Sequence, residues 1–218
     1  MMPQAVGITK HLGENVPNSS SATRRRRRGR PAAASRDDVL RAGMRQYLSG
    51  ERLDVQAIAA QLGLGRTTIY RWFGSREQLI GEVLLRAALP LLAMAHDSAH
   101  GRGGPMLLDT FDRFNRRLAE SSALRRFVEQ ERETALRIMT GGDGPVQPRI
   151  VAAIEELIRN EARDGHYEPP VEPNTLAYAI VRLAEAFLFN EVAAGIRGDV
   201  DRLREVEAAL LGVRASER

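Results

Sequence analysis

Residues 53–79, LDVQAIAAQLGLGRTTIYRWFGSREQL, decide the fold of this chain. They predict two short helices, Val55–Leu62 and about Arg66–Phe73, that meet at a tight turn containing Gly63. Leu64 is expected to fill the angle between the two helices. Two short helices joined in this way are typical of a helix-turn-helix, whose second helix enters the major groove of DNA.

The second of these helices carries side chains that can donate hydrogen bonds to phosphates or base edges. Ile69 and Phe73, four residues apart, are expected to hold this helix to the core. Tyr70 is either a phosphate contact or a core aromatic, and its position on the helix favours the phosphate contact. The predicted DNA contacts on this helix are Arg66, Thr67, Thr68, Tyr70 and Arg71.

Outside this stretch the sequence predicts helices and no strand. Ser35 is expected to cap a first helix that ends at Ser49-Gly50, and Ser75 opens a long helix that runs to about Ser98. Further helices are predicted over 105–120, 122–140, 147–164, 173–196 and 199–211, between runs rich in Gly, Ser and Pro. The predicted class is all-α: a mobile basic tail (1–34), a three-helix helix-turn-helix domain (35–80) and a larger helical bundle (81–218).

Charge is distributed unevenly along the chain. Residues 1–80 contain fourteen basic and six acidic residues, a net charge of +8, whereas the whole chain carries only +4. A basic front end on an acidic body indicates a polyanionic partner for the front end. The run Arg24–Arg28 is either a solvated tail or an arm that seeks a DNA groove. The neighbouring helix-turn-helix favours the arm, so Arg27 and Arg28 are predicted DNA contacts.

The composition argues against several other classes of protein. The chain has no cysteine, which excludes disulfides, thiol chemistry and cysteine-ligated zinc, and fits a cytoplasmic location. No apolar run approaches the ~20 residues of a membrane helix. His96 and His100 have a metal-ligand spacing, but no third ligand is identifiable, so no metal site is predicted. Without a catalytic constellation or a phosphate-binding glycine loop, we expect neither enzyme activity nor a cofactor, and no membrane partner.

The helix-turn-helix resembles the TetR family of bacterial one-component regulators. The similarity covers about 45 residues, from near Ser35 to Leu79. It rests on four segments: Asp54–Ala59, Gly63–Gly65, Thr68–Phe73 and Ser75–Leu79.

Three departures from the family pattern affect the predicted DNA contacts. Thr67 replaces a common glycine and adds a side chain that is expected to reach the groove. Asp54 replaces the usual threonine and would repel phosphate, so a contact there must come from a backbone amide such as that of Val55. Trp72 replaces the usual histidine, and its indole N–H either donates to a phosphate or packs in the core. Val55, Trp72 and Arg76 complete the predicted DNA contacts.

The resemblance implies a homodimeric transcriptional repressor that binds a palindromic double-stranded operator. A small, mostly apolar effector in the bundle would release it from DNA. A regulator without a small-molecule ligand, or an activator, is the alternative. The segment from Arg125 to Glu133 also resembles TetR-type regulators linked to quorum-signal degradation, which would imply a lactone effector.

The bundle supplies the candidate effector and dimer residues. Pocket walls are predicted at Phe111, Phe114, Phe127, Met139, Tyr178 and Phe187. In the family the last two helices usually form a four-helix dimer interface, and a purely intramolecular core is the alternative. The predicted interface residues are Leu183, Leu188, Val192, Leu203 and Leu210. Glu185 and Asn190, polar groups in an apolar helix, are expected either to be partnered in the dimer interface or to line a pocket, because burial without a partner costs about 1–3 kcal/mol each.

Overall fold

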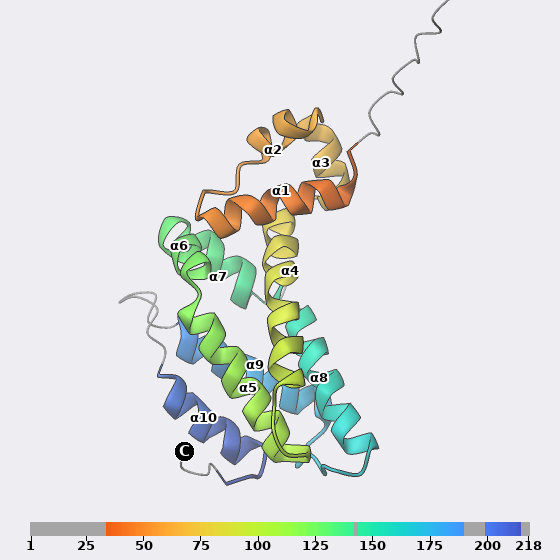
Figure 1. Cartoon of the computed structure of the whole chain (residues 1–218), viewed down its shortest axis with the longest axis vertical. Coiled ribbons are helices and arrows are strands. Elements are labelled where there is room, and N and C mark those ends of the chain that lie inside the picture. The colour runs from red at the N-terminus through yellow and green to blue at the C-terminus, as the bar shows by residue number, and fades with distance from the viewer. Residues whose placement is uncertain (1–33, 142–143, 190–198, 215–218) are drawn as a thin grey trace, which may run out of the picture. The chain divides into compact units, whose positions relative to one another are not determined.

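The computed structural model describes residues 34–141, 144–189 and 199–214, and all regular structure within these ranges is helical (Figure 1). This confirms the all-α prediction. Residues 34–218 belong to one compact unit. The proposed boundary between residues 80 and 81 stays a prediction.

Three helices form the part that we call the head: α1 (Arg36–Ser49), α2 (Val55–Leu62) and α3 (Arg66–Phe73). Their bounds follow from local capping, as the sequence predicts. The Ser35 hydroxyl accepts a hydrogen bond from the Asp38 amide, while the Asp38 carboxylate accepts from the Ser35 amide, which makes a reciprocal capping box. Gly63 ends α2 with a φ of 63°, a left-handed conformation that glycine adopts without strain.

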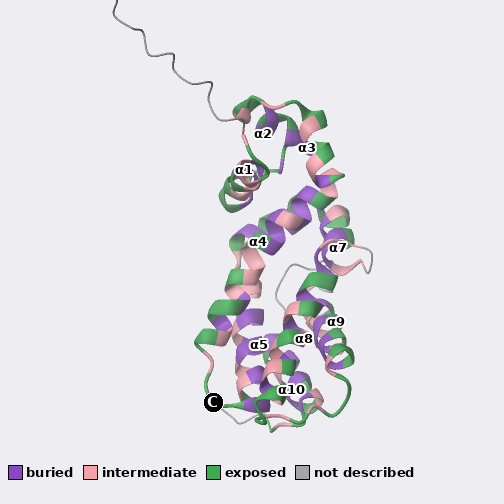
Figure 2. Cartoon of the chain, turned by 90° about the vertical axis from the view of Figure 1, so that its right-hand side faces the viewer, coloured by how far each residue is buried: buried purple, intermediate pink, exposed green. Residues whose placement is uncertain are grey.

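Helix α4 (Arg76–Asp97) packs against both α1 and α3 of the head and against α5, α7 and α8. Its buried side includes Leu79, Ile80 and Val83. Figure 2 shows buried stretches along α4. By length and mean hydropathy this helix could cross a membrane, but such buried packing is typical of a core helix. Helix α4 therefore links the head mechanically to the remaining helices.

The remaining helices form the part that we call the body. They are α5 (Gly103–Glu120), α6 (Ser122–Gln130), α7 (Arg132–Thr140), α8 (Gln147–Arg163), α9 (Pro173–Phe189) and α10 (Val200–Leu210). Helix α9 packs against α8, and α10 packs against both α5 and α9. The head also contacts the body directly, because α1 packs against α6.

One predicted helix is divided in the structure. Instead of a continuous helix over 122–140, α6 ends at Gln130 and α7 begins at Arg132. Glu131 between them has φ −136° and ψ 45°, outside the helical region. Its side chain is buried in an ion pair with Arg76 of α4, so a tertiary contact accompanies the break. The predicted end of the helix over 173–196 falls outside the described residues.

Candidate nucleic-acid interface and ligand cavity

Helix α3 presents one exposed polar face. Arg66, Thr67, Tyr70 and Arg71 are exposed, while Ile69 and Phe73 are buried in the head core. Thr67 lies three residues from Tyr70 and four from Arg71, so these three share a face, as do the buried Ile69 and Phe73, which are four apart. Arg66 is exposed at the first position of the helix. The face therefore offers two guanidinium groups, a threonine hydroxyl and a phenol, which can donate to phosphates and base edges.

Two further predicted contacts lie at the edge of this face. Thr68 and Trp72 are half-buried, and Trp72 packs against the hydrophobic core. Behind the helix, the guanidinium carbon of Arg36 lies 4.6 Å from the centroid of the Phe73 ring. Packing on this side holds α3 so that its polar side chains point away from the core.

The start of α2 supports the expected use of a backbone amide. The Val55 side chain is buried, so only its backbone is suitable for a DNA contact. The Asp54 carboxylate accepts hydrogen bonds from the amides of Gln56 and Ala57, at 2.7 and 3.2 Å. The Asp54 cap therefore occupies the amides of Gln56 and Ala57 and not the amide of Val55.

The prediction that Arg76 contacts DNA is wrong, because this side chain points toward the body. Its two terminal nitrogens donate to the Glu131 carboxylate at 2.8 and 2.6 Å, and one also donates to the Leu53 carbonyl at 3.0 Å. Burial raises the pKa of Glu131, but the hydrogen bond and charge of Arg76, with the charge of Arg52, outweigh burial and hold that pKa below its usual value. Arg76 is therefore a link between head and body.

Two predicted DNA contacts, Arg27 and Arg28, lie outside the described residues.

A cavity of about 340 Å³ lies among the helices and is lined mainly by hydrocarbon. Its size is within the range of small-molecule sites. Its walls come from α4 and from all six helices of the body, and α1 of the head adds Met44, Tyr47 and Leu48. A ligand in this cavity would therefore touch the head and the body at once.

Half of the predicted pocket walls line this cavity. Phe111, Phe114 and Met139 belong to it, but the assignments of the other three aromatic residues are corrected. The Phe127 ring packs edge-on against Tyr47, with centroids 6.4 Å apart, Tyr178 is 52% exposed, and Phe187 lies outside the lining. Aromatic identity alone did not indicate which side of each helix faces the cavity.

Two buried carboxyl groups belong to the cavity wall. The Glu185 carboxylate accepts hydrogen bonds from Gln147 Nε2, at 2.9 and 3.0 Å, and from Arg182 at 2.8 Å. Of the two predicted environments, the pocket wall is the one observed, and the partners of Glu185 lie within the same protomer. Asn190 lies outside the described residues. Burial raises its pKa despite these partners.

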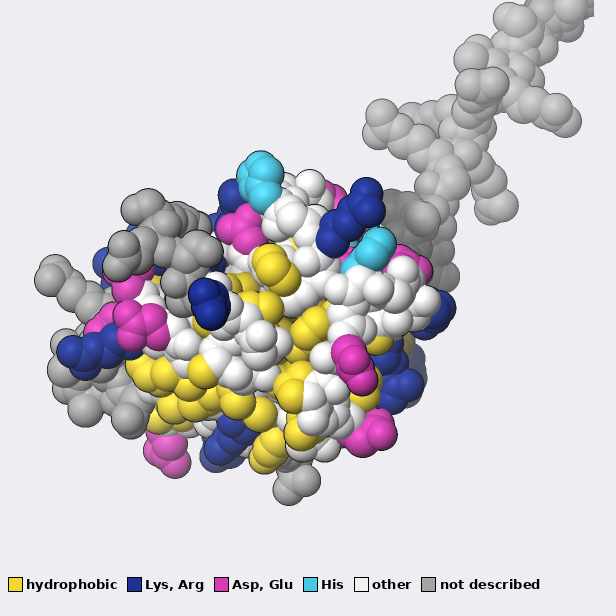
Figure 3. Space-filling view, turned by 90° about the horizontal axis from the view of Figure 1, so that it is seen from below, with side chains coloured by type: hydrophobic (Ala, Val, Ile, Leu, Met, Phe, Trp, Pro, Cys, Tyr) yellow, Lys and Arg dark blue, Asp and Glu magenta, His cyan; other side chains and the backbone are white. Residues whose placement is uncertain are grey.

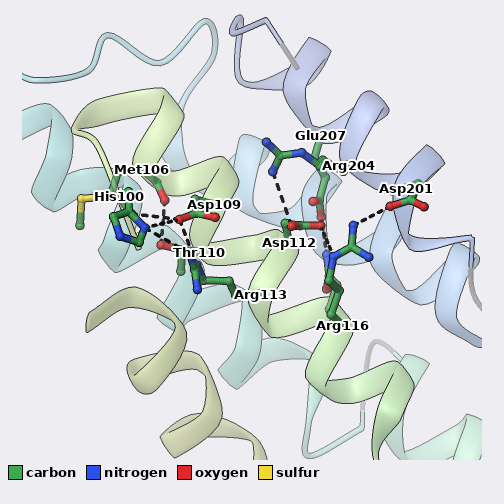
Figure 4. A network of polar contacts seen from close by, with 11 residues as sticks. His100, Met106, Asp109, Thr110, Asp112, Arg113, Arg116, Asp201, Arg204 and Glu207 are labelled. Carbon is green, nitrogen blue, oxygen red and sulfur yellow. Dashed lines mark hydrogen bonds and ion pairs between the residues drawn. The ribbon is translucent and has the colours of Figure 1, made fainter. Parts of the chain in front are cut away.

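The second carboxyl group, Glu207 of α10, was not predicted. Its Oε1 accepts a hydrogen bond from Asn115 Nδ2 at 3.0 Å, beside a network of ionic side chains on α5 and α10 (Figure 4). In that network Asp112 pairs with Arg116 at 3.0 Å and with Arg204 at 3.7 Å. A sequence signal existed, because Glu207 follows Leu203 by four residues on the inward face of its helix.

The predicted interface residues do not all face outward. Leu188 is 2% exposed and lines the cavity, and Leu203 is fully buried, so both belong to the interior of the protomer and their assignment is corrected. Leu183 and Leu210 are half-buried, and Val192 lies outside the described residues. Large hydrophobic side chains nevertheless remain exposed on α9 and α10, including Tyr178 and Val206, and Figure 3 shows hydrophobic side chains gathered on one face.

The described residues contain no group of three or more His, Asp or Glu side chains suited to a metal ion. His100 instead lies 3.4 Å from an Asp109 oxygen through its Nδ1.

Comparisons with known proteins place these features in context. Residues 102–212 match the family model "Tetracyclin repressor-like, C-terminal domain", and residues 51–83 match "Bacterial regulatory proteins, tetR family". No curated protein matches the chain.

Two solved structures are similar to the chain. The transcriptional repressor QsdR of R. erythropolis, from the TetR family, is 27% identical with a TM-score of 0.77, over 84% of this chain and 97% of that one. A putative transcriptional regulator from Rhodococcus sp. RHA1 is 20% identical with a TM-score of 0.53, over 83% and 96%, a likeness of fold alone.

Proposed function

We propose that this chain, which belongs to the TetR family of DNA-binding transcriptional regulators, is a homodimeric repressor that a small, mostly apolar effector releases from its operator. The chain is a regulator and not an enzyme. The observation that carries the proposal is the 340 Å³ cavity whose wall includes residues of both α1 and the body. A regulator without a ligand would be expected to have a filled bundle, so the cavity favours the ligand-responsive function. The proposed place of action is the cytoplasm, and no membrane partner is proposed.

The DNA-binding half of the proposal rests on α3. Its exposed face would enter the major groove, where Arg66, Thr67, Tyr70 and Arg71 reach phosphates and base edges. The arginine run of the tail would add contacts to the minor groove or the backbone. Two-fold symmetry of a homodimer would require a palindromic operator, with half-sites about 34–36 Å apart or a multiple of that spacing.

The effector half of the proposal rests on residues that connect the cavity to the head. Arg86 of α4 lines the cavity, and its Nη1 donates to Asp37 in the first turn of α1 at 2.5 Å. A ligand that displaces α4 would therefore move α1 as well. Release of DNA requires that the ligand prefers the DNA-incompetent arrangement, typically by about 1–3 kcal/mol of coupling.

Dimerisation is proposed through the outer sides of α9 and α10. The exposed Tyr178 and Val206 and the half-buried Leu183 support this surface, since exposed apolar side chains in a group mark interaction sites. Leu183→Asp is expected to give monomers in analytical ultracentrifugation. If this variant remained a folded dimer, the dimer interface would have to lie on another surface of the chain.

A cavity-filling variant tests the whole proposal. Ala184 lines the cavity, so Ala184→Phe is expected to keep operator binding and to lose the response to effectors. Ala152→Phe, on the exposed side of α8, is the matched control. Operators selected from random duplex DNA would be used in mobility-shift assays, with lactones, fatty acids and aromatic compounds as candidate effectors.

Two outcomes would contradict the proposal. An Ala184→Phe protein that still releases DNA with the same effector would place the ligand outside the cavity. Transcription that rises when the protein binds a promoter-linked operator would make it an activator.

A further inference from the structure

Glu207 belongs to the wall of the cavity, and one of its two carboxyl oxygens has no hydrogen-bond partner among the described residues. Its side chain is 0% exposed. Oε1 accepts from Asn115, whereas Oε2 has no hydrogen-bond partner among the described residues. A buried polar atom without a partner costs about 1–3 kcal/mol, so this position favours a ligand that supplies one.

The other carboxyl group of the cavity differs on this point. Both oxygens of Glu185 accept hydrogen bonds, from Gln147 and Arg182. Its hydrogen-bonding capacity is therefore largely occupied by the protein. Glu207 offers the less occupied of the two acidic positions.

The surroundings of Glu207 determine which atom carries a proton. Burial raises its pKa to about 8, with the Asp112 charge adding to the rise and Asn115 and Arg204 opposing it. The carboxyl group is then mostly neutral at pH 7. Because Oε1 accepts the Asn115 hydrogen bond, we expect the proton of the neutral form on Oε2, where it is available for donation.

We propose that Glu207 donates a hydrogen bond from Oε2 to a carbonyl or ether oxygen of an uncharged, mostly aliphatic ligand in the cavity. This inference rests on the proposed function, because it assumes that the cavity is the effector site. It adds the chemical class of the effector and the residue that selects it.

Charged ligands are disfavoured by the same wall. A carboxylate would face Glu185 and Glu207, and the Arg86 guanidinium that lines the cavity is already engaged by Asp37. An ammonium group would have to ionise Glu207 in a site that burial makes unfavourable for charge. An uncharged acceptor avoids both costs.

Three probes of equal chain length test the chemical class: 2-octanone, octanoate and octylammonium. Calorimetric titration of the full chain at pH 7 is expected to show at least tenfold tighter binding of 2-octanone than of either ion. Equal or tighter binding of an ion, or no binding of any probe, overturns the proposal.

Three variants test the residue. Glu207→Leu is expected to weaken 2-octanone binding about tenfold, whereas Glu207→Gln keeps a neutral donor and stays within about threefold of the parent. Glu205→Leu, on the exposed side of the same helix, is the matched control and should bind like the parent. Unchanged affinity in a folded Glu207→Leu protein overturns the assignment.

A pH series gives a second readout if Glu207→Leu does not fold. The parent should bind 2-octanone about tenfold more weakly at pH 9 than at pH 7, because only about a tenth of Glu207 stays protonated there. The charged groups that face this position are Asp112 and Arg116 of α5, Arg204 of α10 and Glu185 of α9. The Glu207→Gln variant retains all four groups but has no titrating side chain at position 207, so its affinity for 2-octanone should not change with pH. If this variant also bound more weakly at pH 9, the pH effect would arise from a group other than Glu207, and the proposal would be overturned.

Failure of this inference and failure of the proposed function are distinguishable. Binding of 2-octanone through Glu207 without any release of operator DNA would refute the effector function and support the Glu207 assignment. Operator release by octanoate or octylammonium alone would support the function and overturn the assignment.

Discussion

The interiors of the head and the body are built from different chemistry. Within the described residues, the head core consists of side chains such as Val39, Ile58, Ile69 and Phe73, and it contains no buried charged group. The buried charged side chains of that part of the chain all lie in the body: Asp112, Glu131, Glu161, Glu185 and Glu207.

The proposed function accounts for this difference. In it the head acts through its outer face, so its interior needs only to hold α3 firmly, and apolar packing does this without polar partners. The body of the proposed regulator acts through its interior, where ligand recognition would need polar groups within an apolar wall. Buried carboxyl groups reduce stability unless they are partnered, and their retention in the body is consistent with recognition and with coupling.

The largest expected effect tests the apolar head. Ile69 is fully buried, so Ile69→Ala should lower the free energy of unfolding by about 2–5 kcal/mol, because it removes buried methyl groups and leaves a cavity. Chemical denaturation at pH 7 and pH 4 should give the same decrease, since no charge is involved. Thr67→Ala, on the exposed side of α3, is the control, with a change below about 0.5 kcal/mol. If the decrease in unfolding free energy changed strongly with pH, the head core would not be free of charge effects, and the contrast with the body would be contradicted.

The next effect tests a buried charge of the body. Arg76→Ala leaves Glu131 buried with only its longer contact to Arg52, at 3.3 Å, and should cost about 2 kcal/mol at pH 7. Because the folded-state pKa of Glu131 lies below its unfolded value of 4.5, the pair stabilises the fold above pH 4.5 and loses that contribution as pH falls through the folded pKa. The deficit of the variant should therefore shrink in acid.

Arg137→Ala is the matched control for Arg76. Arg137 also joins α7 to α4, through Glu77 at 3.4 Å, but its side chain is 60% exposed. Exposed pairs contribute little, so the expected decrease in unfolding free energy is below about 0.5 kcal/mol. Equal decreases in the two variants would mean that burial does not distinguish these pairs.

A smaller effect is expected on the outer face of the head. Arg71→Ala and Tyr70→Phe should each weaken operator binding about tenfold or less, without changing the unfolding free energy or the dimer. Arg163→Ala, an exposed arginine of the body, should bind DNA like the parent. Mobility-shift titrations measure this, and unchanged affinity of both head variants would remove α3 from the proposed interface.

The smallest effect on folding is expected from the tail. Deletion of residues 1–30 should leave the unfolding midpoint unchanged, because their sequence offers little to pack. It should reduce the dependence of log affinity on log salt by up to about 0.9 for each phosphate that the tail neutralises in the parent. An unchanged salt dependence would mean that the arginine run does not contact DNA.

Much of the fold was predictable because the helices carry their own boundary signals. The bounds of α2 and α3 agree with the prediction, since Asp54, Gly63 and Gly74 act on neighbouring residues alone. The division of the predicted helix over 122–140 was not predictable, because it accompanies an ion pair between Glu131 and Arg76, 55 residues away in sequence.

The sequence by itself determined which face of α3 is polar. Periodicity places Ile69 and Phe73 on one side and Thr67 and Arg71 on the opposite side, whatever the rest of the chain does. Arg66 is close in helical angle to Phe73 and is exposed at the first position of the helix. Only the tertiary structure decided which body residues face the cavity. There Leu188 and Glu207 line the cavity, while Tyr178 lies outside it. A helix with apolar residues on several sides does not reveal from its sequence which side faces the cavity, because that is set by the packing of the neighbouring helices.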